Sequence, residues 1–145
     1  MYNALDVAQY VINHEAAKGR TVSNLRLQKL LYFIQAQFIV NTPNEEPCFP
    51  QRMEAWDFGP VVPCVYREYK YCGSAAIPPE EMNTAIFSRT DRDLIDAMLD
   101  HCGNMTTSAL VDATHSQAPW CNAYHNFFGN EITIESMRDY FGEVQ

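Results

Sequence analysis

The sequence lacks the glycine-rich motifs that hold nucleotide phosphates. Its 145 residues include only six glycines, none of them clustered, and contain neither a G-x-G-x-x-G segment nor a P-loop. Nucleotide chemistry therefore has no support in this sequence.

Long apolar runs are also missing. No stretch reaches the roughly 20 apolar residues that a membrane-spanning helix needs. The first residues, from Met1 to Asp6, do not show the basic segment and apolar run of a signal peptide. We therefore expect a cytoplasmic protein with no membrane partner.

Cysteine is present in an odd number and without any C-x-x-C pair. We expect free, reduced thiols that pack as small hydrophobic side chains. His115, Cys121 and His125 lie close in sequence, but one Cys-x₃-His pair falls short of the paired ligands typical of structural zinc. We therefore expect no metal, no cofactor and no catalytic residue, with a cryptic metal or thiol enzyme left as an alternative. The cysteines are Cys48, Cys64, Cys72, Cys102 and Cys121.

Basic residues are scarce. Ten Lys and Arg face eighteen Asp and Glu, which gives a formal charge of −8. This balance argues against a nucleic acid partner, since such binding depends on neutralising phosphates, and it favours a partner with a basic surface. Arg20, Arg26 and Lys29 form the densest basic group, at the start of a helix too apolar to lie in a major groove. We expect them to be the solvated end of that helix.

Apolar residues make up 47% of the chain, enough for one substantial core. No repeat or linker divides the sequence, so residues 1–145 are expected to form a single domain. Helical spacing of apolar residues predicts a mainly α fold. The predicted helices cover residues 3–18, 24–40, 61–72, 90–102 and 107–115, with a last one that follows Thr133 and ends at Gly142.

The segment at about 24–40 is expected to be the buried central helix of this compact helical domain. Leu27, Leu30, Leu31, Ile34 and Phe38 form an apolar stripe, and from Leu30 onward almost every face carries an apolar residue. A helix that is apolar most of the way round is usually surrounded by other elements.

A short β-strand or hairpin is predicted near residues 49–58, with Gly59-Pro60 as the turn that leads into the next helix. Alternation along a strand places Glu54, Trp56 and Phe58 on one side. We expect the two aromatic rings to pack in the core or at a hinge. A buried carboxylate needs a partner, and Lys29 is the expected one.

Three segments together resemble the Panacea antitoxin domain family, also described as SocA-like antitoxins or phage-associated proteins. The resemblance covers roughly residues 4–141 and implies a domain that binds another protein and has no enzymatic activity. The segments are L-R-L-Q-K-L-L-Y at 25–32, E-A-W-D-F-G-P-V-V-P at 54–63 with Val65-Tyr66 after it, and H-S-Q-A-P-W at 115–120.

The resemblance implies an antitoxin that neutralises a cognate toxin by direct binding. Two alternatives remain: an adaptor that delivers a bound partner to a protease, and a DNA-binding regulator. The oligomeric state is left open. His115 with Pro119-Trp120 is expected to form a structural corner, and Tyr71 to be exposed. The candidate signature and partner-binding residues are Gln28, Lys29, Tyr32, Glu54, Trp56, Asp57, Gly59, Pro60, Tyr66, Tyr71, His115, Pro119 and Trp120.

Overall fold

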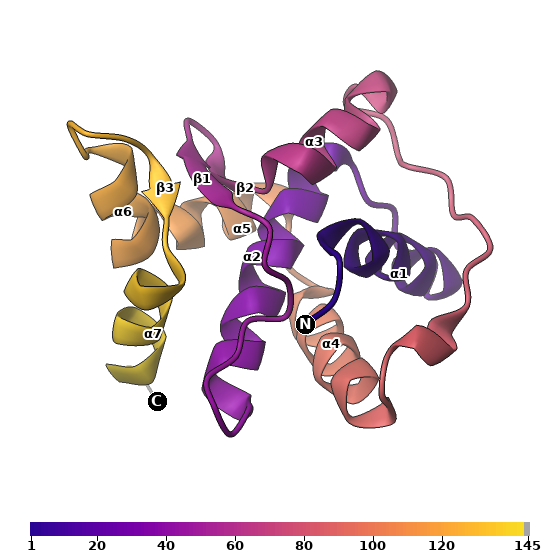
Figure 1. Cartoon of the computed structure of the whole chain (residues 1–145). Coiled ribbons are helices and arrows are strands. Elements are labelled where there is room, and N and C mark those ends of the chain that lie inside the picture. Colours follow the sequence, from indigo (N-terminus) through magenta and orange to yellow (C-terminus); the bar gives the residue numbers. More distant parts are fainter. Residues whose placement is uncertain (144–145) are drawn as a thin grey trace.

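The computed structural model describes residues 1–143 as a mainly α fold with one small sheet, which confirms the predicted fold class (Figure 1). Val144 and Gln145, which belong to the predicted domain range, lie outside the described residues. The α-helices are α1 (Ala4–Ala17), α2 (Asn24–Asn41), α3 (Pro63–Tyr69), α4 (Arg89–Cys102), α5 (Thr107–His115), α6 (Ala118–Tyr124) and α7 (Ile134–Glu143), and the strands are β1 (Met53–Trp56), β2 (Gly59–Val61) and β3 (Glu131–Ile132).

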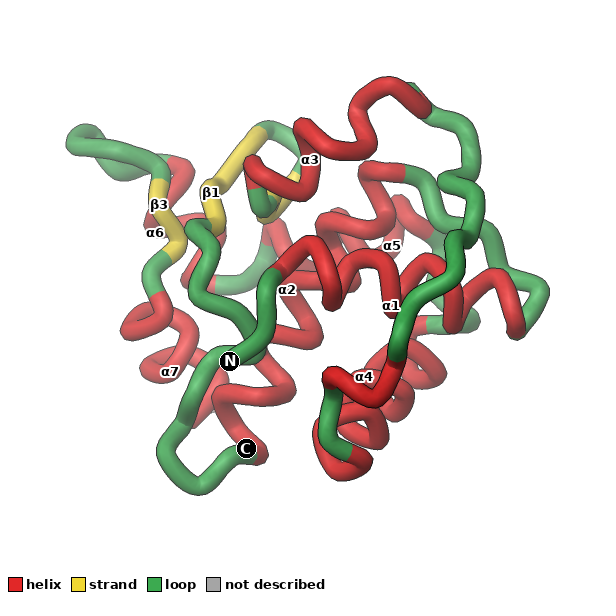
Figure 2. Tube along the Cα trace, turned by 45° about the vertical axis from the view of Figure 1, so that its right-hand side comes forward, coloured by secondary structure: helices red, strands yellow, loops and turns green. Residues whose placement is uncertain are grey.

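Helix α2 is the centre of the fold, as its sequence predicts. Thirteen of its 18 residues are buried. Helices α1 and α4 cover one side of it and α6 and α7 lie on the other, in both views of the molecule (Figures 1 and 2). The helix begins after Ser23, whose hydroxyl accepts a hydrogen bond from the amide of Arg26 at 3.2 Å.

The basic start of α2 is not solvated, so that prediction is wrong. Arg26 is 8% exposed and Lys29 is fully buried. The Arg26 guanidinium donates to the carbonyl oxygens of Cys102 and Met105, at 3.0 and 2.8 Å. Cys102 is the last residue of α4 and Met105 lies in the segment that follows it, where helix geometry no longer provides internal partners for the carbonyls. Arg26 thus serves the fold rather than a phosphate.

The sheet has the strand order β2-β1-β3, and both pairings are antiparallel. Asp57 and Phe58 form the turn between β1 and β2, and Gly59 pairs with Trp56. The prediction that Gly59-Pro60 is itself the turn is therefore wrong, because both residues belong to β2. Strand β3, which has only two residues, was not predicted.

Three helix boundaries also differ from the prediction. Helix α4 begins at Arg89, one residue before the predicted start, and is capped by Ser88, whose hydroxyl accepts from the amide of Asp91. Helix α7 continues through Gly142. The predicted helix at 61–72 divides into α3 and a short 3₁₀ segment, Lys70–Cys72.

No helix within residues 1–143 combines the length and apolar character needed to cross a membrane. All five cysteines are free thiols.

Candidate partner-binding groove

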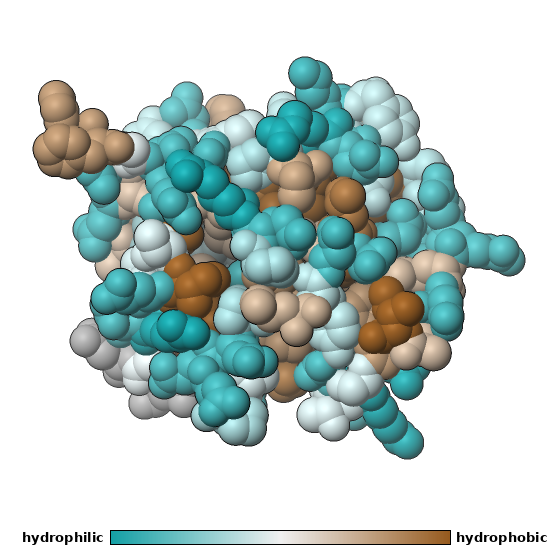
Figure 3. Space-filling view, viewed as in Figure 1, coloured by the Kyte–Doolittle hydropathy of each residue, from teal (hydrophilic) through white to brown (hydrophobic). Residues whose placement is uncertain are grey.

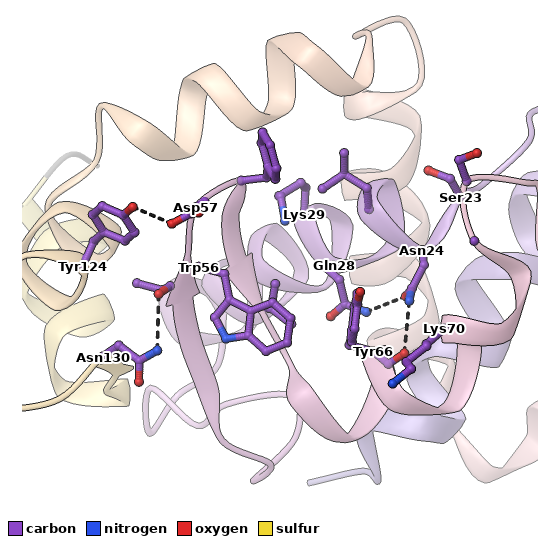
Figure 4. Close-up of a pocket in the computed structure, with 16 residues that line it drawn as sticks. Ser23, Asn24, Gln28, Lys29, Trp56, Asp57, Tyr66, Lys70, Tyr124 and Asn130 are labelled. Carbon is purple, nitrogen blue, oxygen red and sulfur yellow. Dashed lines mark hydrogen bonds between the residues drawn. The ribbon is translucent and has the colours of Figure 1, made fainter.

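A groove of about 860 Å³ lies where the start of α2, the β1-β2 hairpin, α3 and the segment after α6 meet (Figure 4). Its volume is within the range of ordinary ligand sites. The wall is mainly apolar and aromatic, and the floor carries polar side chains of α2. The main wall residues are Leu25, Trp56, Phe58, Val61, Tyr66 and Tyr124, and the floor residues are Asn24, Gln28 and Lys29.

A chain of hydrogen bonds holds the groove floor to its wall. Gln28 donates to the Asn24 side chain at 2.9 Å, and Asn24 donates to the carbonyl oxygen of Tyr66 at 3.1 Å (Figure 4). The Gln28 side-chain oxygen in turn accepts from the amide of Val62 at 2.9 Å. Since these buried groups are all paired, Asn24 and Gln28 position α3 and β2 against α2.

Lys29 lies in the floor beneath strand β2. Its side chain is fully buried, and its ammonium donates to the carbonyl oxygen of Pro60 at 2.9 Å. Burial lowers the pKa of Lys29 to about 7, because the charged form loses its hydration. Gly59 lets the strand approach this closely, since an added Cβ would lie 2.8 Å from Cε of Lys29.

Glu54 does not pair with Lys29, so that prediction is wrong. Its carboxylate accepts from the indole Nε1 of Trp56 at 3.0 Å and from Nε of Arg52 at 3.0 Å. Each partner lies two residues from Glu54, Trp56 within β1 and Arg52 just before it, and the Glu54 side chain is still 23% exposed. Trp56 also meets the ring of Tyr66 edge-on, with centroids 4.9 Å apart. Glu54 thus fixes the orientation of a wall residue of the groove.

Replacing Glu54 with alanine is expected to lower the free energy of unfolding by about 1 kcal/mol, since a partly exposed carboxylate with two hydrogen bonds is lost. Urea denaturation measures the change. Glu131→Ala is the matched control, because it removes the other carboxylate partner of Arg52 and leaves Trp56 paired. A loss above about 3 kcal/mol for Glu54→Ala would indicate a buried structural charge instead.

Helix α6 supports the hairpin from behind through stacked rings. Trp120 lies between His115 and Tyr124, with centroid distances of 4.1 and 4.5 Å. Its indole donates to the carbonyl oxygen of Trp56 at 2.9 Å, and the Tyr124 hydroxyl donates to Asp57 at 2.5 Å. The corner predicted around Trp120 therefore holds the turn that rims the groove.

The structure brings together only part of the predicted residue set. Gln28, Lys29, Trp56, Asp57 and Tyr66 line the groove. Behind it, packed into the fold, lie Pro119, Trp120 and the buried Tyr32, whose hydroxyl donates to Gln117 at 2.8 Å.

Tyr71 and Phe58 are both exposed, but only the exposure of Tyr71 was predicted. Tyr71 is 74% exposed, as predicted, and lies outside the groove lining. Phe58 is 67% exposed at the hairpin turn, so the prediction that its ring packs in the core or at a hinge is wrong.

Sequence reasoning missed Phe127 and Phe128. Each is 93% exposed, on the loop that joins α6 to β3. This loop projects from the body at the upper left of Figure 1, where the surface shows an apolar protrusion (Figure 3). Its flanking residues, Tyr124 and Asn130, line the groove. Two adjacent phenylalanines in a polar stretch before Gly129 were the available signal.

The residues suspected of metal or thiol chemistry have other partners. The Cys121 thiol donates to the backbone oxygen of His115 at 2.9 Å. Within the described part of the chain, no cluster of three or more His, Cys, Asp or Glu side chains is arranged to hold a metal ion.

The family model described as "Antitoxin SocA-like, Panacea domain" matches residues 27–121. The chain belongs to this family. It is also 35% identical over 130 residues to Antitoxin SocA of Caulobacter vibrioides, an alignment that covers 81% of this chain and 68% of that protein. No solved structure matches.

Membership in the SocA-like Panacea family supports an antitoxin role. The range matched by the family model includes most of α2, the hairpin and α3, and therefore most of the groove. The Phe127-Phe128 loop lies beyond that range.

Proposed function

We propose that this protein neutralises a cognate toxin by covering part of its surface, in the cytoplasm and without making or breaking bonds. The toxin-facing surface consists of the groove together with Phe127 and Phe128. Residues 1–145 act as one domain through this surface.

The observation that carries the proposal is the exposure of this aromatic pair beside the groove. A pair of phenylalanines that are each 93% exposed leaves apolar area in water, which marks a site of interaction. Aromatic residues are typical anchors of protein interfaces. Phe58, also exposed, adds to the same rim.

The charge of the chain supports a basic toxin. A formal charge of −8 speeds encounter with a positive surface and repels anionic competitors. The basic residues at the start of α2 do not form an exposed basic face that could follow a phosphate backbone, because Arg26 is buried against α4 and Lys29 lies at the floor of the groove. A DNA-binding role therefore receives no support from that helix.

The test is co-expression with the product of the neighbouring gene, in cells where that product stops growth. The double variant Phe127→Ser/Phe128→Ser is expected to bind the toxin at least tenfold more weakly than the native chain and to lose growth rescue, because two interface anchors are removed. Ile86→Ser is the matched control, because Ile86 is an exposed apolar residue that is not part of the groove lining.

Rescue by the double variant, or a neighbour that is harmless alone, would contradict the proposal. Pulse-chase measurement of the toxin level distinguishes a direct inhibitor from a protease adaptor. A direct inhibitor leaves the toxin level unchanged, whereas faster toxin turnover would favour the protease adaptor.

A further inference from the structure

Lys29 is a buried cation with little internal compensation. Its ammonium carries three donors, and its hydrogen-bond partner among residues 1–143 is one backbone oxygen, that of Pro60. No carboxylate of the described chain forms an ion pair with it, and burial is the cause of its lowered pKa.

The other buried or partly buried cations near this end of α2 each have several partners within the chain. Arg26 donates to two backbone carbonyls and to the Thr107 hydroxyl. Arg20 pairs with Glu15 at 2.6 Å and Asp100 at 3.0 Å. Lys29 differs from both because its ammonium has a single hydrogen-bond acceptor among residues 1–143, so its buried charge is the least compensated of the three. Buried donors without partners are costly, so a ligand that supplies acceptors here gains an advantage.

The groove around Lys29 joins an apolar wall to positive charge. Trp56 and Tyr66 form the aromatic part of this wall, and Lys70 adds a second cation to the lining. The acidic lining residue, Asp57, already accepts a hydrogen bond from Tyr124 and is turned toward that ring (Figure 4). Although the protein as a whole has a charge of −8, the two lysines and the aromatic wall of this site favour an anion that carries an apolar group.

We propose that the groove binds the C-terminal residue of a partner polypeptide, with its carboxylate on Lys29 and its apolar side chain against Trp56 and Tyr66. A chain end carries both groups on one residue. An internal Asp or Glu needs a second residue to provide the apolar group and brings backbone on both sides into the groove. The inference rests on the proposed function only for the partner's identity, which would then be the toxin.

The probes are N-acetyl tripeptides that end in Phe, Leu, Val or Trp, each as the free carboxylate and as the amide. A third probe, N-acetyl-Phe-Asp-Ala amide, places the acid inside the chain. Titration of the ¹⁵N-labelled full chain near pH 6.5, followed by amide chemical shifts, gives each Kd. At least one carboxylate peptide is expected to bind with a Kd below about 1 mM, and its amide at least tenfold more weakly. The shifts are expected at the start of α2 and in the hairpin.

Lys29→Met is expected to weaken the carboxylate peptide at least tenfold, because methionine keeps the apolar volume and removes the cation. Lys18→Met, which removes a half-exposed lysine at the C-cap of α1, is the matched control and is expected to leave binding unchanged. The amide spectrum of each variant verifies its fold.

Three outcomes would overturn the inference: equal binding of acid and amide, equal binding of the internal aspartate probe, or no binding by any carboxylate peptide. If the peptides bind but the native protein does not rescue growth, the carboxylate site is supported and the proposed antitoxin function is contradicted. If the native protein rescues growth but no peptide binds, the antitoxin function is supported and the carboxylate site is contradicted.

Discussion

Replacing Gly59 with alanine is expected to lower the free energy of unfolding by at least about 3 kcal/mol. Gly59 has a φ of +107°, a conformation that residues with a Cβ adopt only under strain. The new Cβ would also lie 2.8 Å from both Cε of Lys29 and Oγ1 of Thr114. Both neighbours are buried, so neither can move into solvent.

Gly19→Ala is the matched control for this experiment. Gly19 also has a positive φ, of +73°, but an added Cβ there meets no atom within 4 Å. Its cost is expected to be about 1–2 kcal/mol from the backbone conformation alone. Urea denaturation measures the free energy of unfolding of the two variants. The difference between them separates the cost of backbone strain from the cost of the steric contact at Gly59. If both lose the same stability, the contact between Gly59 and Lys29 does not constrain the strand.

Local patterns were sufficient to predict the parts of the fold that depend on short-range spacing. The apolar stripe of α2 identified the central helix, and its predicted range of 24–40 differs from the observed Asn24–Asn41 by one residue. The hairpin region was found because alternation precedes the Gly59-Pro60 pair. These features are fixed within a few residues of the chain, where propensity and periodicity act.

Features that depend on distant partners were not predictable. Arg26 is buried because its guanidinium donates to the carbonyl of Cys102 at the end of α4, which is 76 residues away in the sequence. In sequence it looks like any charge at a helix start. Strand β3 has two residues and forms only because β1 presents a free edge. Glu54 was assigned a distant partner although Arg52, two residues away, was available.

The groove, too, was predictable only in part from the sequence. The signature residues were selected by resemblance, and five of them line it. Which members face the groove and which support it from behind depends on the packing of α6, since Trp120 and Tyr124 hold the turn through Trp56 and Asp57. A linear pattern contains no information about that orientation.

Lys29→Met is expected to change how stability depends on pH. The folded-state pKa of Lys29 is about 7, whereas an unfolded lysine titrates near its ordinary value of about 10.4. Between these values the unfolded chain binds more protons, so the free energy of unfolding of the native protein rises with pH. The slope is at most about 1.4 kcal/mol per pH unit, and below pH 7 the contribution of Lys29 is at its lowest and flat.

The variant lacks this titration, so its advantage over the native chain is expected to be largest near pH 6. That advantage is expected to shrink by about 2 kcal/mol by pH 8.5. The lost hydrogen bond to Pro60 gives an offset of about 1 kcal/mol that does not vary with pH.

Urea denaturation of both proteins from pH 6 to 8.5 measures the difference. Higher pH is avoided because burial raises the pKa of Cys102 to about 11 and of Tyr69 to about 12, and groups shifted upward lose their stabilising contribution as pH rises through this range. Lys18→Met is expected to follow the native curve in parallel. Parallel curves for Lys29→Met as well would mean that the ammonium is solvated in the folded protein, and its spare donors would then have no need of a ligand.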